Sequence, residues 1–143
     1  MIYNSSGILF PGIYVMSWNE LIKEFGFSTH RIHLFEGMKR ALLQFQYAGC
    51  QQVYIDGSFV TKKFEPGDYD ACWDTIGVDV KKLDPVFTDF TFGTKPQKFK
   101  YYGEFYPAGQ VSRAGMTFLD FFQTDKSTGD RKGIIKIELG RLQ

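Results

Sequence analysis

Two aspartates, Asp68 and Asp70, stand one residue apart at the start of a short apolar run. In a strand, residues i and i+2 point to the same face and lie about 6.5 Å apart along the chain. Two carboxylates placed in this way repel each other, and the pKa of each rises unless a cation lies between them. Mg²⁺ binds one or two carboxylates together with phosphate oxygens and water. The pair therefore predicts a metal site, although a simple turn at Gly67 and Asp68 would leave only Asp70 to be explained.

A glycine–serine pair, Gly57-Ser58, closes the apolar run that precedes the two aspartates. A glycine after a strand lets backbone N–H groups turn outward and form an anion-binding nest. The serine adds a hydroxyl that donates a hydrogen bond to a phosphate oxygen. Lys62 and Lys63 follow in the same loop, where they either reach phosphates or are simply solvated, and Lys132 before a later strand is similar. A triphosphate bound by this loop would bring its metal ion close to the aspartates.

A third acid, Asp120, has apolar neighbours on both sides in the sequence TFLDFF. An unpaired buried carboxylate costs several kcal/mol, so Asp120 is expected to have a partner. One alternative is a salt bridge to a lysine or arginine. The other is a functional role, either as a metal ligand or as the base that takes a proton from an attacking hydroxyl.

The Gly57-Ser58 pair and the Asp68-Tyr69-Asp70 triplet together resemble the motif of the DNA polymerase β-like nucleotidyltransferase superfamily. The longer string DGSFVTKKFEPGDYD, followed by FLDFFQTD and KGI, is similar to a small bacterial and phage family of that superfamily. This second resemblance spans residues 7 to 139.

The resemblance implies a role for each candidate residue. Gly57 and Ser58 would bind the phosphates of a nucleoside triphosphate (NTP), and Lys62 and Lys63 are added as phosphate-binding candidates only because they lie in the same loop. Asp68, Asp70 and Asp120 would form the catalytic and metal-binding acids, with Mg²⁺ or Mn²⁺ as the cofactor. The implied reaction moves a nucleoside monophosphate from NTP to a hydroxyl group on a protein, an RNA or a small molecule. Small members of the superfamily act in toxin–antitoxin pairs, so the resemblance also implies a protein partner.

A second hypothesis is a binding module of the same fold that performs no catalysis and serves as an antitoxin or a scaffold. The three acids favour the enzyme, because a binding module has no physical need for clustered carboxylates. The chain shows no additional domain that would grip a polymer or a base, and this favours the binding module.

The elements that must position these residues follow from the hydrophobic pattern. Ser17 and Glu20 form a capping box at the start of a helix that ends before Gly26, and a longer helix runs from Ser28 as cap to Gly49 as stop. The strand patterns are Gln52–Ile55, Tyr69–Trp73, Met116–Gln123 and GIIKIEL, the last two joined by a hairpin loop. Residues 93–116 are expected to be a long irregular connection, and Val80 begins a possible short helix. The order predicts an α/β or α+β fold, with a nucleotidyltransferase-like mixed β-sheet backed by helices.

Length and composition set the outer limits of the interpretation. The 143 residues fit a single domain, and the net charge of +1 provides no overall field that would attract nucleic acid or a membrane. No apolar stretch approaches the 18 residues that a membrane-spanning helix needs. Cys50 and Cys72 form no framework of pairs, and a free buried thiol is expected for Cys72. We expect a cytoplasmic protein with no membrane partner.

Overall fold

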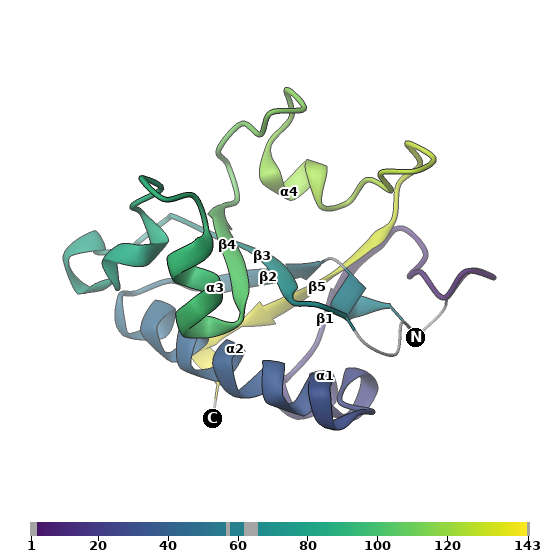
Figure 1. The fold of residues 1–143 in the computed structure, drawn as a ribbon, viewed down its shortest axis with the longest axis horizontal. Coiled ribbons are helices and arrows are strands. Elements are labelled where there is room, and N and C mark those ends of the chain that lie inside the picture. The colour runs from purple at the N-terminus through teal and green to yellow at the C-terminus, as the bar shows by residue number, and fades with distance from the viewer. Residues whose placement is uncertain (1–2, 57, 62–65, 143) are drawn as a thin grey trace.

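The computed structural model describes residues 3–56, 58–61 and 66–142. Within these ranges five strands form one mixed sheet with the order β1-β5-β2-β3-β4 (Figure 1). The strands are β1 (Gly12–Val15), β2 (Gln52–Asp56), β3 (Tyr69–Trp73), β4 (Gly103–Pro107) and β5 (Gly133–Glu138), and the α-helices are α1 (Trp18–Phe25), α2 (Thr29–Tyr47), α3 (Lys95–Tyr101) and α4 (Phe118–Phe121). Four 3₁₀ turns complete these elements: η1 (Ser58–Val60), η2 (Val80–Lys82), η3 (Pro85–Phe87) and η4 (Leu139–Arg141).

The sheet lies between two layers of unequal size. Strands β1 and β5 are parallel, β5 and β2 are antiparallel, β2 and β3 are antiparallel, and β3 and β4 are parallel. Helices α1 and α2 cover one face, whereas α4 and the loop between α4 and β5 lie on the other (Figure 1). The predicted mixed sheet backed by helices is therefore confirmed. Among the described residues, no helix is long and apolar enough to cross a membrane.

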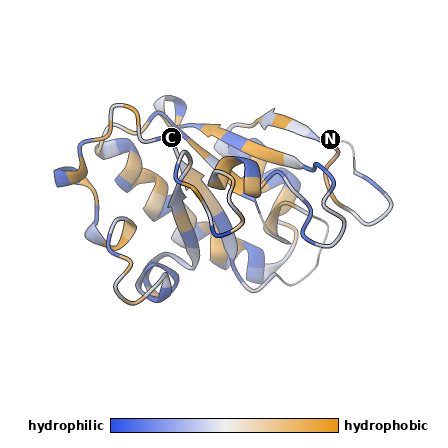
Figure 2. Cartoon of the chain, turned by 90° about the horizontal axis from the view of Figure 1, so that it is seen from above, coloured by the Kyte–Doolittle hydropathy of each residue, from blue (hydrophilic) through white to orange (hydrophobic). Residues whose placement is uncertain are grey.

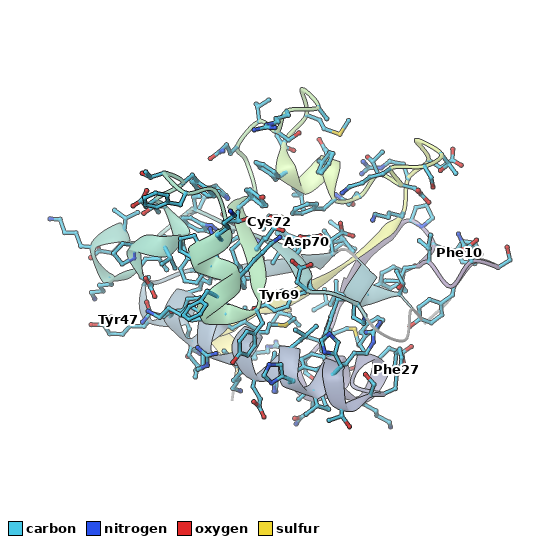
Figure 3. All side chains as sticks on the ribbon, in the orientation of Figure 1. Phe10, Phe27, Tyr47, Tyr69, Asp70 and Cys72 are labelled. Carbon is cyan, nitrogen blue, oxygen red and sulfur yellow. The ribbon has the colours of Figure 1, made fainter. Side chains whose placement is uncertain are left out.

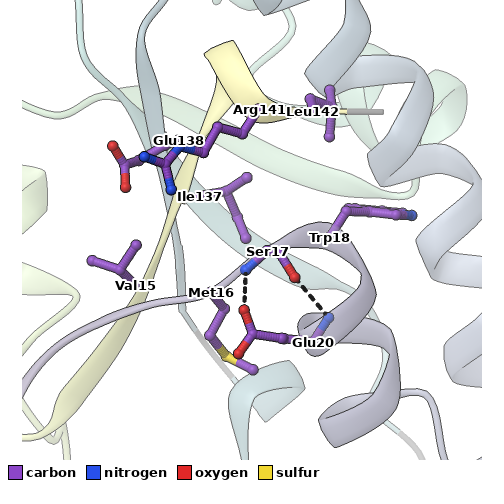
Figure 4. A pocket seen from close by; sticks show the side chains of 9 residues that line it. All are labelled: Val15, Met16, Ser17, Trp18, Glu20, Ile137, Glu138, Arg141 and Leu142. Atoms are coloured by element: carbon purple, nitrogen blue, oxygen red, sulfur yellow. Dashed lines mark hydrogen bonds between the residues drawn. The ribbon is translucent and has the colours of Figure 1, made fainter.

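The first two helices begin where their capping residues predict. The Ser17 side chain accepts a hydrogen bond from the Glu20 backbone, and the Glu20 carboxylate accepts one from the Ser17 backbone (Figure 4). The Ser28 hydroxyl accepts a hydrogen bond from the Arg31 backbone at 3.1 Å and caps α2 in the same way. Each cap satisfies backbone donors that the first turn of a helix leaves unpaired, which is why both starts are readable from sequence.

The larger core lies between the sheet and α2. Hydrophobic residues follow the strands and alternate with hydrophilic ones around the helices (Figure 2). The aromatic centre of this core is Phe45, whose ring lies 4.4–5.3 Å from those of Phe87, Phe105 and Trp73. Ring pairs at such spacings contribute about 0.5–1.5 kcal/mol each beyond the area that they bury. The α2 side of the sheet is thus a rigid support for the opposite face.

A smaller apolar cluster occupies that opposite face, beneath α4. It is formed by Tyr54, Cys72, Ala108, Phe122 and Ile134. Both cysteines of the chain, Cys50 and Cys72, are buried and free. The expectation of a free buried thiol at Cys72 is therefore confirmed.

Residues 93–116 are not the irregular connection that the glycines and prolines suggest, because they contain α3 and β4. Helix α3 packs close to α2, where Gly37 leaves room for the Tyr101 backbone: a Cβ at Gly37 would lie 2.3 Å from the Tyr101 carbonyl oxygen. Tyr102 then reverses the chain with a φ of 67° and leads directly into β4. A left-handed residue that is not glycine is uncommon, so this turn was not predictable from composition.

The strand expected at Met116–Gln123 is also wrong, and with it the hairpin expected between this segment and β5. The segment contains the short helix α4, whose N-cap Thr117 accepts a hydrogen bond from the Asp120 backbone at 3.2 Å. Aromatic residues favour strands, but the preference is weak and depends on context. Here Phe118 and Phe122, four residues apart, pack together onto the smaller cluster as a helix allows.

A buried arginine holds the chain that follows β2. The Arg31 side chain is fully buried and donates hydrogen bonds to the carbonyl oxygens of Phe25, Phe59 and Thr61, at 3.2, 2.5 and 3.1 Å. Phe59 lies in η1 and Thr61 comes just after it. The guanidinium therefore ties α2 to the segment that carries Ser58.

Arg31→Met is expected to lower the free energy of unfolding by about 2–5 kcal/mol, because hydrogen bonds to a charged donor are lost and buried carbonyl oxygens are left unpaired. Urea unfolding of the variant measures this loss. The matched change Arg141→Met removes an exposed arginine and should cost less than about 0.5 kcal/mol. Equal losses in the two variants would contradict the role assigned to Arg31.

Candidate metal centre

Three carboxylates lie side by side across three neighbouring strands. In the sheet register Asp56 of β2 pairs with Asp70 of β3, and Asp70 pairs with Glu104 of β4. Residues paired in this way point to the same face of a sheet. Tyr54 lies two residues before Asp56 in β2, and Cys72 lies two residues after Asp70 in β3, so these side chains share a face with the two aspartates. Both Tyr54 and Cys72 belong to the smaller cluster, so this is the face beneath α4. Figure 3 labels Asp70 and Cys72 on β3.

Asp68 completes the group by lying two residues before Asp70. One carboxylate oxygen each from Asp68, Asp70 and Glu104 lies within 4.8 Å of the others. Oxygens bound to one Mg²⁺ lie about 3–4 Å apart, because the ion holds each of them at about 2.0–2.1 Å in octahedral geometry. Small rotations of these side chains therefore suffice to bring three hard oxygen ligands onto one ion.

Polar side chains hold Glu104 in place within this acidic group. Its Oε2 accepts hydrogen bonds from the hydroxyls of Thr94 at 3.0 Å and Tyr106 at 2.7 Å. The ammonium of Lys98 lies 2.9 Å from Glu104 Oε1 and 3.5 Å from Asp68 Oδ2. Burial raises the pKa of Glu104, but the hydrogen bonds from Tyr106, Lys98 and Thr94 outweigh it, so this pKa lies below its usual value. The Glu104 carboxylate is therefore ionised at neutral pH, as a metal ligand would need to be.

The two aspartates behave differently. Burial raises the pKa of Asp68 above its usual value, even though the nearby Lys98 ammonium opposes the shift. For Asp70, burial first and then the charges of Glu104, Asp68 and Asp56 raise the pKa to about 7. Four carboxylates thus share one end of the sheet, and their mutual repulsion falls most heavily on Asp70. A divalent cation would relieve this repulsion.

The raised pKa of Asp70 makes stability depend on pH. The unfolded chain releases this proton near pH 4 and the folded protein near pH 7, so the stability of the metal-free protein falls as the pH rises between these values and then levels off. Asp70→Asn removes the effect. In the absence of divalent ions we expect the variant to be about 1–3 kcal/mol more stable than the wild type at pH 8.

This advantage should shrink as the pH falls from 7 toward 4, and it should vanish below the unfolded-state pKa, where Asp70 is protonated in both states. Urea unfolding in a chelator at pH 4.5 and pH 8 measures both differences. A stability advantage of the same size at both pH values would show that the ionised Asp70 carboxylate does not destabilise the folded protein.

Lys98 competes with any metal for the same carboxylates. Its side chain is 47% exposed, so it can leave the acids at little cost. Lys98→Met should lower the melting temperature of the metal-free protein by a few degrees, since about 0.2–1 kcal/mol of ion pairing is lost. The same variant should gain more from added Mg²⁺ than the wild type does. Differential scanning fluorimetry with and without Mg²⁺ tests both effects, and a smaller gain in the variant would contradict them.

A cavity of about 410 Å³ opens on the β2 side of the acidic group, away from Glu104. Asp56 and Asp70 line it together with Lys126, Ser127 and Lys132. The Lys132 ammonium lies 3.2 Å from Asp56 Oδ1, and the Asp56 side chain is 5% exposed. The buried carboxylate therefore fixes Lys132 at the cavity wall. This side of the group carries the ammonium groups of Lys126 and Lys132, which bind anionic oxygens.

The structure does not bring every predicted site residue to this place. Asp120 lies in α4 with a side chain that is 56% exposed, and its carboxylate is 3.9 Å from the guanidinium of Arg131. Of the two alternatives for Asp120, the structure therefore shows the salt bridge to an arginine. Among the described residues, the group suited to a metal ion comprises Asp68, Asp70 and Glu104.

The predicted phosphate loop is only partly described. Gly57, Lys62 and Lys63 lie outside the described residues. For Ser58 the structure describes the backbone. Strand β2 ends at Asp56, and Ser58 is the first residue of η1. The predicted roles of these four residues therefore stay predictions.

Glu104 and Asp56 are the site residues that sequence reasoning missed. Glu104 stands in KYYGEFYP, where lysines, glycine and proline surround the aromatic residues and suggest a loop. The available signal was the alternation in GEFYP, where Glu104 and Tyr106 share one face and the buried Phe105 points to the other. Asp56 directly precedes the glycine–serine pair and reads as part of a turn rather than as the last residue of a buried strand.

A different cavity, of about 260 Å³, lies where α1 begins and the last turn of the chain ends (Figure 4). Its walls include Ser17 and Glu20, whose polar groups are engaged in the capping box, together with Trp18 and Arg141. Both carboxyl-bearing residues in its lining, Glu20 and Glu138, stand on separate elements. Among the described residues, the carboxylates of this lining form no cluster like that of Asp68, Asp70 and Glu104.

The fold and the site define an α+β protein whose mixed sheet carries a row of carboxylates at one end. The chain belongs to a family of unknown function (DUF6932), whose family model matches residues 1–138. No curated protein and no solved structure matches the chain.

Proposed function

We propose that this protein is a Mg²⁺-dependent nucleotidyltransferase, which moves a nucleoside monophosphate from NTP to a hydroxyl group. The observation that carries the proposal is the convergence of the Asp68, Asp70 and Glu104 carboxylates within 4.8 Å, on the strand end next to the predicted phosphate loop. The resemblance of Gly57-Ser58 and Asp68-Tyr69-Asp70 to the polymerase β-like superfamily supports it. In this proposal Glu104 has the role of third acid that the resemblance implied for Asp120.

The acidic group suits a hard divalent cation. Its donors are all carboxylate oxygens, which are the ligands that Mg²⁺ and Mn²⁺ prefer over nitrogen and sulfur. When bound, such an ion neutralises charge on the transferred phosphoryl group and on the leaving oxygen. Asp68, Asp70 and Glu104 would hold it.

The other residues of the site supply orientation and charge. Lys132, fixed by Asp56, and Lys126 line the cavity on the β2 side, where they would bind the β- and γ-phosphates. In the reaction, the acceptor oxygen forms a bond to the α-phosphorus while the bond from that phosphorus to the bridging oxygen breaks. Pyrophosphate leaves toward the lysines, and the acceptor proton passes to solvent. Positioning and electrostatic stabilisation account for most of the catalysis in such transfers.

A second candidate is a binding module of this fold that performs no catalysis. The observation that favours it is Lys98, which already neutralises part of the acidic group through its contacts with Asp68 and Glu104. A permanent ion-pair network of this kind needs no metal. In that case the group would be a structural feature of the surface, and a protein partner, as in a toxin–antitoxin pair, would be the functional ligand.

Incubation with each α-³²P-labelled NTP and Mg²⁺ or Mn²⁺ separates the two candidates. The acceptors to supply are the protein itself, total RNA and co-purified proteins. Transfer predicts label that becomes covalently attached to one acceptor with release of pyrophosphate. Absence of label with all four nucleotides and both metals, for a protein that is folded and binds metal, would favour the binding module.

A further inference from the structure

A second, larger cavity lies beside the acidic group on the β4 side. Its volume is about 830 Å³, within the range of small-molecule sites. Its walls come from β4, α4 and the loops before α3 and after β4, and its aromatic lining residues are Phe90, Tyr106, Phe118 and Phe121. The rings of Tyr106 and Phe118 are nearly parallel, at 10° and 4.2 Å between centroids, and Phe90 is within 8° of the Tyr106 plane. The 4.2 Å between the Tyr106 and Phe118 centroids leaves no room for a base between these two rings, so a flat, unsaturated ring would stack on the outside of this aromatic group.

The aromatic cavity is coupled directly to the acidic group. Tyr106 and Thr94 both line the cavity, and both donate their hydroxyl hydrogen bonds to Glu104. A molecule bound in this cavity therefore lies close to the two hydroxyl groups that hold Glu104 in place. Phe121 lines both this aromatic cavity and the 410 Å³ cavity that Lys126 and Lys132 line on the β2 side.

The two cavities differ in chemical character. The β2 side of the acids carries Lys126 and Lys132, whereas the β4 side carries stacked aromatic rings. A nucleotide has a matching arrangement, with anionic phosphates at one end and a planar base at the other. Bases stack on aromatic side chains with little dependence on sequence, because every base has a π-face.

We propose that the aromatic cavity binds the base of the donor nucleotide, with its phosphates crossing the acidic group toward Lys132. This inference rests on the proposed function for the place of the phosphates, but it concerns binding and does not require transfer to occur. Arg113, also in the cavity lining, would contact the edge of the base. The fold would thus supply a base-binding site without an additional domain.

Isothermal titration calorimetry in Mg²⁺ tests this inference. The ligands are inorganic tripolyphosphate and the four nucleoside triphosphates with a methylene bridge between the α- and β-phosphates, so that no pyrophosphate can leave. The wild type should bind at least one nucleotide about 5- to 150-fold more tightly than tripolyphosphate, which is the contribution expected of one stacked base.

Two variants locate this preference in the cavity. Ala114→Trp fills the cavity from its exposed loop, and Phe118→Leu removes one ring while it keeps an apolar side chain. Each should weaken nucleotide binding by about 5-fold or more and leave tripolyphosphate binding unchanged. Ile76→Trp is the matched control, because Ile76 is 72% exposed and lies in the lining of neither cavity. It should change neither affinity.

The possible results separate this inference from the proposed function. Nucleotide preference that Ala114→Trp abolishes supports the base site even if no labelled product ever forms. Equal affinity for nucleotides and tripolyphosphate, or no binding of either, overturns it, even if transfer occurs. A short RNA with a 5′-hydroxyl end serves as a further ligand. If Ala114→Trp weakens RNA binding but not nucleotide binding, the cavity serves an acceptor base and the inference is wrong.

Discussion

Asp70→Asn is expected to reduce nucleotidyl transfer by about 10³-fold or more, while the protein remains folded. Asp70 is the central carboxylate of the row, next to Asp56 on one side and Glu104 on the other. Its loss would remove a ligand of the proposed metal ion, which would compensate charge on the transferred phosphoryl group, and such preorganised charge stabilises the transition state more than the bound substrate. The measurement is the initial rate of label transfer from α-³²P-labelled NTP.

Two controls accompany this measurement. Asp130→Asn removes an exposed carboxylate from the loop before β5 and should leave the rate within 2-fold, roughly what a surface substitution worth ±0.5 kcal/mol allows. Ser58→Ala removes one predicted phosphate donor, so it should slow transfer by about one to two orders of magnitude without abolishing it. Transfer that survives Asp70→Asn undiminished would refute the catalytic role of the acidic group.

Glu104→Gln should abolish stabilisation by Mg²⁺, whereas Asp120→Asn should leave it intact. A ligand that binds only the folded state adds about 2.7 kcal/mol at a concentration one hundred times its dissociation constant. Glu104 belongs to the convergent group, and its glutamine variant keeps the shape but loses the charge. Asp120 is exposed and paired with Arg131, so its charge is not needed at the site. Melting temperatures across a Mg²⁺ titration measure both variants.

The contrast between these two acids decides which one is the third ligand. If Asp120→Asn loses the Mg²⁺ response and Glu104→Gln keeps it, the sequence-based assignment is right and the geometry described above is not the functional one. If both variants respond as the wild type does, the ion binds elsewhere. A small loss of metal-free stability in Glu104→Gln is expected in any case, because Lys98 loses a partner at 2.9 Å.

The parts of the fold that sequence predicted are those with strong local signals. Helix α2 begins and ends near its predicted cap and stop, and β3 matches the expected strand residue for residue. Asp70 was placed correctly on β3 because alternation within a strand fixes which side chains share a face. Local chemistry alone carried this information.

The missed parts depend on contacts between distant segments. Glu104 becomes a site residue only because β4 pairs in parallel with β3, which requires α3 to cross over and pack against α2 at Gly37. No pattern within KYYGEFYP encodes that pairing. The strand expected around Asp120 is wrong for the converse reason: its aromatic neighbours suggest a strand, but Thr117 caps a short helix, and the Asp120 carboxylate is exposed beside Arg131.

Asp68, Asp70 and Glu104 are proposed to form a divalent metal site. Crystals grown or soaked with Mn²⁺, and measured near the manganese absorption edge, test it most directly. We expect an anomalous peak in contact with oxygens of all three carboxylates, with Lys98 moved away from Asp68 and Glu104. A fully loaded crystal whose peaks lie only elsewhere, with the Lys98 ammonium still bridging the two acids, would contradict it.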